Sequence, residues 1–160
     1  MSAQTKYGFS TPIGVAGGIY DIAPYAIDTF LNSEETGALK PGLGVVAGTK
    51  AGVEIAIPTS ASAALEGVVT NNRTTEFDMD GKMRMVKGAS VGVMRYGRIY
   101  VRVAAGVEPA YGDAAYVVAT GEEAGFFTTA SSGTIAVKAR FLGAAKDGIA
   151  LVELFNQAQK

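Results

Sequence analysis

The segment from Gly88 to Val103 constrains the fold more than any other part of the chain. In its second half, Ile99, Val101 and Val103 alternate with two arginines and a tyrosine. Successive side chains of a strand point to opposite faces, so this alternation predicts a half-buried strand. Gly97 precedes the alternation and permits a backbone conformation that other residues avoid. We therefore predict a central hairpin or bent strand in an all-β domain.

The rest of the chain predicts a single β-sandwich or barrel-like domain, of about nine or ten short strands, over residues 33–160. Apolar or alternating runs are separated by Gly, Pro, Asn and Asp, and the 21 Gly favour many tight turns. Besides the central segment, the expected strands are 43–46, 53–57, 65–70, 82–86, 115–118, 126–129, 135–142 and 149–155. No long stretch has a helical period.

Residues 1–32 are predicted to form an extended N-terminal arm. The arm is rich in apolar and aromatic residues, but they follow neither a helical period nor a clean alternation. Such a stretch is too apolar for a solvated linker. Two interpretations stay open, a loop that folds back on its own domain and an arm that becomes ordered on a neighbouring subunit. The arm residues expected at an interface are Tyr7, Phe9, Ile13, Tyr20 and Tyr25.

The densest cluster of positive charge consists of Arg95, Arg98 and Arg102. Guanidinium groups bind carboxylates and phosphates well. The cluster is compatible with a solvated strand face, with a protein interface to acidic partners and, less well, with nucleic-acid contact. Only Tyr96 and Tyr100 are interleaved with the arginines, which is too few aromatics for a base-stacking surface. We predict that the three arginines form the basic face of an interface.

The composition removes several function classes. The chain has no Cys and no His, which excludes the commonest metal ligands, His general bases and Ser-His-Asp triads. A net charge of -1 gives no global attraction to nucleic acid or to an anionic membrane, and no apolar run is long enough to span a bilayer. The paired carboxylates are Glu34 with Glu35, Asp78 with Asp80, and Glu122 with Glu123. They lie in polar turns, so we expect no enzyme, metal or cofactor.

Six short segments occur in a suggestive order along the chain. They are Tyr7–Phe9, Leu43–Val46, Leu65–Val69, Val91–Arg98, Pro109–Asp113 and Glu123–Thr128. Together they resemble the structural cement, or capsid decoration, proteins of tailed bacteriophages. The similarity covers most of the chain, from residue 7 to residue 155.

The resemblance implies a non-enzymatic virion protein on the outer surface of the major capsid protein shell, made in the host cytoplasm. It implies that the protein bridges neighbouring capsid subunits and stabilises the head against internal DNA pressure. We also expect a homo-oligomer, a dimer or a trimer, on the capsid. A clamp of this kind works by buried area repeated over a shell. Alternatives are a phage tail or baseplate β-structural protein, a carbohydrate-binding β-sandwich and, least favoured, an enzyme that acts through carboxylates.

Overall fold

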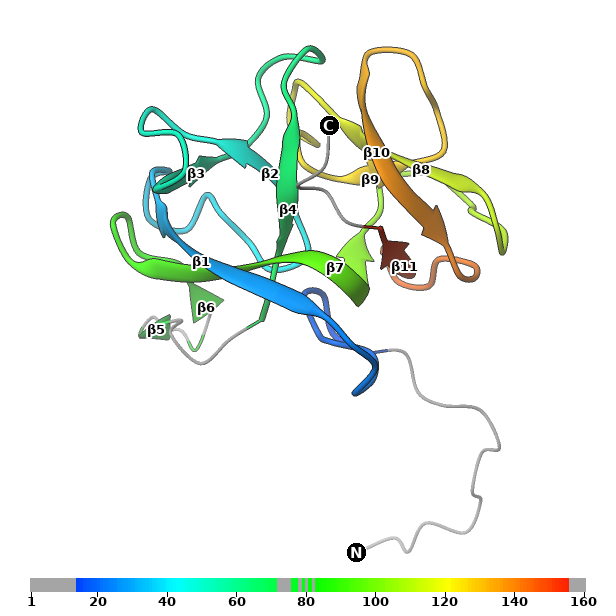
Figure 1. The fold of residues 1–160 in the computed structure, drawn as a ribbon, viewed down its shortest axis with the longest axis horizontal. Coiled ribbons are helices and arrows are strands. Elements are labelled where there is room, and N and C mark those ends of the chain that lie inside the picture. Colours follow the sequence, from blue (N-terminus) through cyan, green and yellow to red (C-terminus); the bar gives the residue numbers. More distant parts are fainter. Residues whose placement is uncertain (1–13, 72–75, 78, 80, 82, 156–160) are drawn as a thin grey trace, which may run out of the picture.

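The computed structural model describes residues 14–71, 76–77, 79, 81 and 83–155. These residues form eleven strands and no helix, which confirms the predicted all-β class (Figure 1). The strands are β1 (Ala26–Asn32), β2 (Gly44–Ala47), β3 (Glu54–Ala56), β4 (Leu65–Val69), β5 (Glu76–Phe77), β6 (Met83–Arg84), β7 (Ser90–Arg102), β8 (Ala114–Val118), β9 (Phe127–Thr128), β10 (Thr134–Phe141) and β11 (Ile149–Leu154).

Five of the strands pair into a closed ring. Their order is β1, β3, β2, β4 and the first half of β7, which pairs back with β1. All neighbours are antiparallel except β1 and β3, which run parallel. Closing a sheet on itself leaves no open edge for unwanted pairing. The barrel-like alternative of the prediction is therefore the correct one for this part of the chain.

The second half of β7 begins another group of strands, in the order β7, β11, β10, β8 and β9. Phe127 in β9 forms a parallel bridge with Val103, which directly follows β7. The amide of Ala104 also donates to the carbonyl of Phe127 at 2.9 Å. This group of strands thus returns to the end of β7, and β7 is common to both groups. Strands β5 and β6 form a separate two-stranded sheet.

The bend in β7 lies at Gly97. Its φ of 124° lies in the range that side-chain-bearing residues rarely adopt. Tyr96 pairs with β1 of the ring, whereas Gly97 pairs with Leu154 of β11. The central segment is therefore one bent strand and not a hairpin, and its bend marks the transition between the two groups of strands.

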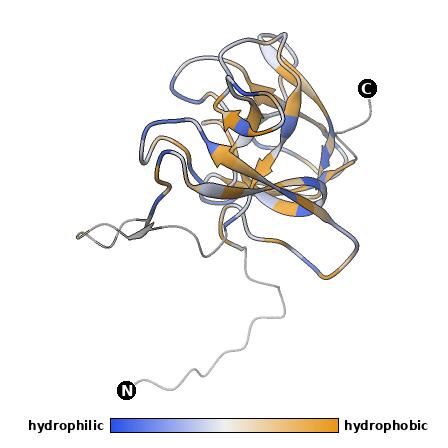
Figure 2. Ribbon diagram, turned by 60° about the vertical axis from the view of Figure 1, so that its left-hand side comes forward, coloured by the Kyte–Doolittle hydropathy of each residue, from blue (hydrophilic) through white to orange (hydrophobic). Residues whose placement is uncertain are grey.

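Two hydrophobic cores follow from this arrangement. The smaller one contains side chains of the ring strands, including Phe30, Val45, Ile55, Val69, Val91 and Val93. The larger one contains Val46, Val68 and Met94 from the ring together with the second group of strands. Successive residues of β2 and β4 thus contribute to different cores. Many of the strands carry hydrophobic residues, with hydrophilic ones interspersed among them (Figure 2).

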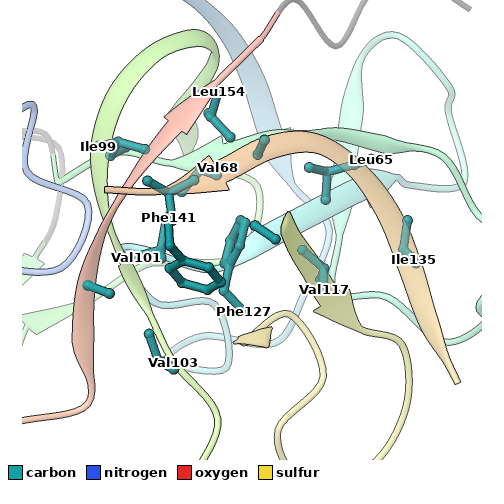
Figure 3. Close-up of a cluster of buried hydrophobic side chains, with 14 of the residues drawn as sticks. Leu65, Val68, Ile99, Val101, Val103, Val117, Phe127, Ile135, Phe141 and Leu154 are labelled. Carbon is teal, nitrogen blue, oxygen red and sulfur yellow. The ribbon is translucent and has the colours of Figure 1, made fainter. Parts of the chain in front are cut away.

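The predicted alternation in the second half of β7 is confirmed. Ile99 and Val101 are completely buried in the larger core, and Val103 is 4% exposed. These side chains lie around the rings of Phe127 and Phe141 (Figure 3).

Residues 14–25 pack along the second half of β7, on their own domain. Gly17 donates to the carbonyl of Tyr100 at 2.7 Å, and the amide of Tyr100 donates to Gly18 at 3.0 Å. Ile19 forms an antiparallel bridge with Ile99. This packing leaves the ring of Tyr100 largely buried at 9% exposure. The described residues before β1 therefore match the folded-back interpretation, while the division of the chain at residue 32 stays a prediction.

Strand β1 was not expected from the sequence, and it lies within the predicted arm. Its partners are β3 on one side and the first half of β7 on the other, from Ala26 opposite Tyr96 to Leu31 opposite Ser90. Only Phe30 and Asn32 of this strand are buried. The strand completes the ring through its pairing with β7, although its sequence lacks a strong apolar pattern.

Candidate interaction surface

Arg95, the first arginine of the predicted basic cluster, is tied into the ring. Its Nε lies 2.8 Å from Asp28 Oδ2 on β1, and its Nη2 lies 2.6 Å from Glu66 Oε2 on β4. Its guanidinium carbon also lies 5.3 Å from the centroid of the Phe30 ring. Both carboxylates belong to strands that pair with β7. Arg95 therefore joins three strands of the ring through internal ion pairs.

Arg98 belongs to a row of alternating charges that crosses the second group of strands. Its Nη1 lies 2.9 Å from Asp21 Oδ2, and its Nε lies 3.3 Å from Glu153 Oε1. Arg140 donates from Nε to Glu153 Oε2 at 2.8 Å. Arg98 is paired with Glu153 in the β7–β11 register, and Glu153 with Arg140 in the β11–β10 register. We call these four residues, Asp21, Arg98, Glu153 and Arg140, the charge ladder.

The ladder is electrostatically self-contained. The pKa of Glu153 is lowered, because first Arg140 and then Arg98 donate hydrogen bonds to its carboxylate. The pKa of Arg98 is raised by its hydrogen bonds to Glu153 and Asp21. Both shifts favour the ionised forms. Two arginines balance two carboxylates, so the ladder has a net charge of zero near neutral pH.

Aromatic side chains flank the ladder. The guanidinium carbon of Arg140 lies 5.8 Å from the ring centroid of Tyr111 and 5.9 Å from that of Phe155. Tyr96 and Phe155 line a small hollow of 110 Å³ together with Arg98. Tyr111 is 70% exposed, and Tyr96 and Phe155 are each 43% exposed. We call the charge ladder together with Tyr96, Tyr111 and Phe155 the ladder face.

The predicted arm residues have different positions. Tyr20 packs edge-on against Tyr100 with ring centroids 6.0 Å apart, and it stays 42% exposed. Tyr25 is 50% exposed, and its Cβ lies directly against Gly97. The remaining predicted arm contacts lie outside the described residues; they are Tyr7, Phe9 and Ile13. The role of all five residues in an interface stays a prediction.

Arg102 has an environment of its own. Its Nε donates to the carbonyl oxygen of Pro41 at 2.9 Å. The side chain is half-buried, and this burial lowers its pKa. The three arginines thus have three different environments. Arg95 forms ion pairs within the ring, Arg98 belongs to the charge ladder, and Arg102 is half-buried beside Pro41. Whether Arg95, Arg98 and Arg102 support an interface stays a prediction.

Sequence reasoning did not select the other members of the ladder face. Arg140 and Glu153 lie in strands that were expected, but sequence alone does not say that these strands are neighbours. Asp21 precedes the sheet and is 77 residues from Arg98. Opposite charges on two strands indicate an ion pair only when it is known that the two strands are neighbours and which residues lie opposite each other.

Two further findings concern other classes of site. Within the described residues, no group of three or more His, Cys, Asp or Glu side chains is placed to hold a metal ion. None of the described residues belongs to a helix that is long and apolar enough to cross a membrane.

Comparison with solved structures gives an independent view of the fold. The chain is similar to a chain in "The capsid of Myoviridae Phage XM1", with a TM-score of 0.72 and 20% sequence identity. The similarity covers 96% of this chain and 98% of that one. At this level of identity, the likeness shows a shared fold. A comparison with curated proteins found no match.

Comparison with protein families agrees with the resemblance seen in the sequence. The family described as structural cement protein (E217 gp24/Pam3 gp6) matches residues 3–155. The match covers both groups of strands and almost the whole chain. The chain therefore belongs to the phage structural cement protein family and is a structural protein of the phage capsid.

Proposed function

We propose that this protein binds the outer surface of the phage head, bridges neighbouring major capsid protein subunits and stabilises the shell. Family membership supports the association with the capsid. The ladder face supports a docking role, because it gathers exposed aromatic and arginine side chains on neighbouring strands and on the residues beside them. These residue types are enriched at the centre of protein interfaces, and they contribute most of the binding energy there. The presence of these side chains on one exposed face is the main structural support for the proposed docking role.

The ladder face is organised before it meets a partner. Arg98 is held by two carboxylates, and Arg140 is held by Glu153 and lies near two aromatic rings. Ordering a flexible, rotamer-rich side chain at an interface costs about 0.5–1.5 kcal/mol. Because these long side chains already have fixed partners, docking through them avoids much of that cost. Arg98, Glu153 and Arg140 also lie on strands, which hold side chains more precisely than loops do.

A bridging protein needs more than one contact, and the chain offers separate regions for them. The ladder face lies on the second group of strands. The apolar residues of 1–13 are proposed to supply another contact, to a neighbouring subunit or to a second copy of this chain. A dimer or a trimer on the capsid belongs to the same proposal. Several modest contacts on one rigid shell bind far more tightly together than each does alone.

The test uses phage heads produced without this protein, to which purified protein is added. Wild type is expected to bind them and to raise the temperature at which they release DNA. The double variant Tyr96→Ser/Phe155→Ser removes two exposed rings from the ladder face and is expected to bind at least about ten-fold more weakly. Occupancy is measured by sedimentation and gel densitometry, and the melting temperature of each free protein is measured in parallel.

The matched control is Val53→Ser, which also removes an exposed apolar side chain, one that is 49% exposed beside β3. This variant is expected to bind like wild type. Failure of wild type to bind the heads would contradict the proposed function itself. Equal binding by all three proteins would assign the docking role to another surface.

A further inference from the structure

Arg102 lies in an open groove of about 560 Å³, apart from the charge ladder. The groove is formed by Gly14 and Val15 on one side and by Lys40 and Pro41 on another. Both charged lining residues, Lys40 and Arg102, are cations. The described groove therefore has two positive charges and no negative one.

The guanidinium of Arg102 differs from those of the other arginines in this region. Arg95, Arg98 and Arg140 each pair with at least one carboxylate. Arg102 makes one hydrogen bond, from Nε to the Pro41 carbonyl, and its Nη atoms have no partner among the described residues. Arg102 is a half-buried cation with no carboxylate beside it among the described residues, so it has given up part of its hydration and has gained no counter-charge. A carboxylate is the group that best restores it, since it accepts two parallel hydrogen bonds from one guanidinium.

We propose that this groove receives an Asp or Glu side chain of the capsid subunit that the protein docks on. The inference rests on the proposed function and adds the chemistry of the partner. Lys40, which is exposed at the rim, contributes a second positive charge to the same carboxylate-bearing segment. The ladder face would then supply neutral, aromatic contacts, and the Arg102 groove would supply a charged one.

Other occupants fit the groove less well. The terminal segments 1–13 and 156–160 contain no Asp or Glu, so neither offers a carboxylate side chain. Among the described residues, no aromatic side chain lines the groove, which disfavours a nucleic-acid strand that would need stacking platforms. Asp78 and Asp80 of the same chain lie outside the described residues, and the experiment below tests them directly.

The first experiment measures binding to heads that lack this protein, at salt concentrations from about 50 to 300 mM. Arg102→Gln is expected to bind at least about ten-fold more weakly at low salt and to depend less on salt than wild type. Arg102→Lys keeps the charge without the two-pronged geometry and is expected to fall between the two. Lys50→Gln removes an exposed cation elsewhere, one that is paired with Glu54, and is expected to match wild type.

Lys40→Glu keeps the test interpretable if the Arg102 variants fold poorly, because Lys40 is exposed and its side chain forms no hydrogen bond or ion pair with the described residues. It is expected to weaken binding by placing a like charge beside the incoming carboxylate. Wild-type binding by Arg102→Gln and Lys40→Glu would overturn the groove inference and leave the proposed function standing. No binding by wild type would instead refute the proposed function.

The second experiment identifies the occupant by cross-linking. The chain has no Cys, so Lys40→Cys takes a photoreactive maleimide at a single position. Illumination on the heads is expected to give an adduct with the major capsid protein. An adduct with a second copy of this chain, or with DNA, would overturn the inference. So would an Asp78→Asn/Asp80→Asn variant that reproduces the Arg102→Gln defect, because the carboxylate would then belong to the chain itself.

Discussion

Replacing Gly97 by Ala tests whether the bend in β7 is needed to join the two groups of strands. A Cβ at this position would lie 2.7 Å from the Cβ of Tyr25 and 3.3 Å from the sulfur of Met94. Ordinary contacts of a Cβ begin at 3.4 Å, so the Tyr25 backbone would have to move by several tenths of an ångström. The φ of 124° adds backbone strain for any residue with a side chain.

The expected cost follows from these two effects. A sparsely populated backbone conformation costs about 1–3 kcal/mol, and forcing an extra carbon into a packed site costs about 1–3 kcal/mol. Alanine recovers about 0.4–1 kcal/mol by restricting the unfolded chain. We therefore expect Gly97→Ala to lower the free energy of unfolding by about 1–5.5 kcal/mol. For a chain of this size, the melting temperature should fall by roughly 2–4 °C for each kcal/mol lost.

The assay is equilibrium unfolding in urea, followed by fluorescence and circular dichroism. The control is Gly106→Ala, because Gly106 also has a positive φ, of 74°, but a Cβ there would meet nothing within 4 Å. It should lose only about 1–2 kcal/mol, which is the backbone cost alone. A second check is Tyr25→Gly, which removes the clashing Cβ. The double variant Gly97→Ala/Tyr25→Gly should be more stable than the sum of the two single effects predicts.

A Gly97→Ala variant that is no less stable than Gly106→Ala would contradict a special role of the bend at Gly97. An additive double variant would show that the contact with Tyr25 is not the cause. Because Tyr96 and Arg98 flank the bend, loss of the correct geometry at Gly97 should also reduce binding to heads, even at temperatures where the variant is folded.

Three further outcomes are expected. Since the folded-state pKa of Glu153 is lowered, its contribution to stability is present above its unfolded pKa of about 4.3 and is lost as the pH falls through the folded value. The free energy of unfolding of Glu153→Gln should therefore fall less than that of wild type between about pH 5 and pH 3. Phe141→Ala should lower the free energy of unfolding by about 3–5 kcal/mol in urea, because Phe141 is fully buried in the larger core. Deletion of residues 1–25 should lower the melting temperature by uncovering Tyr100, whereas deletion of residues 1–13 should leave it unchanged and reduce occupancy on heads.

The parts of the fold that the sequence revealed are those with a local pattern. The alternation of Ile99, Val101 and Val103 against polar neighbours predicted the second half of β7. Strand β1 lacks such a pattern, because exposed Asp28 and buried Asn32 stand where an alternating strand would have apolar residues of one face. Its formation depends on long-range pairing with β7, which no short window contains.

The basic cluster shows why proximity in sequence misleads at a bend. Arg95 and Arg98 are three residues apart, but Gly97 lies between them and turns the strand from one group of partners to another. Arg95 consequently meets carboxylates of β1 and β4, and Arg98 meets Glu153 of β11. The sequence showed three cations close together, whereas their counter-charges come from distant segments that only the strand register brings together.

The division between paired and unpaired arginines also bears on how Arg98→Glu should be interpreted. That change would place three carboxylates together, with Asp21 and Glu153 around the new one, so it would disturb the ladder itself as well as any contact with a partner. Lower binding by this variant would not separate the two effects. Salt dependence separates them, since a neutral ladder that docks through aromatic rings changes little with ionic strength, whereas the contact of an unpaired cation with a carboxylate weakens as salt screens it. A protein that uses both surfaces should therefore keep a salt-resistant part of its affinity when Arg102 is replaced, and a salt-sensitive part when Tyr96 and Phe155 are replaced.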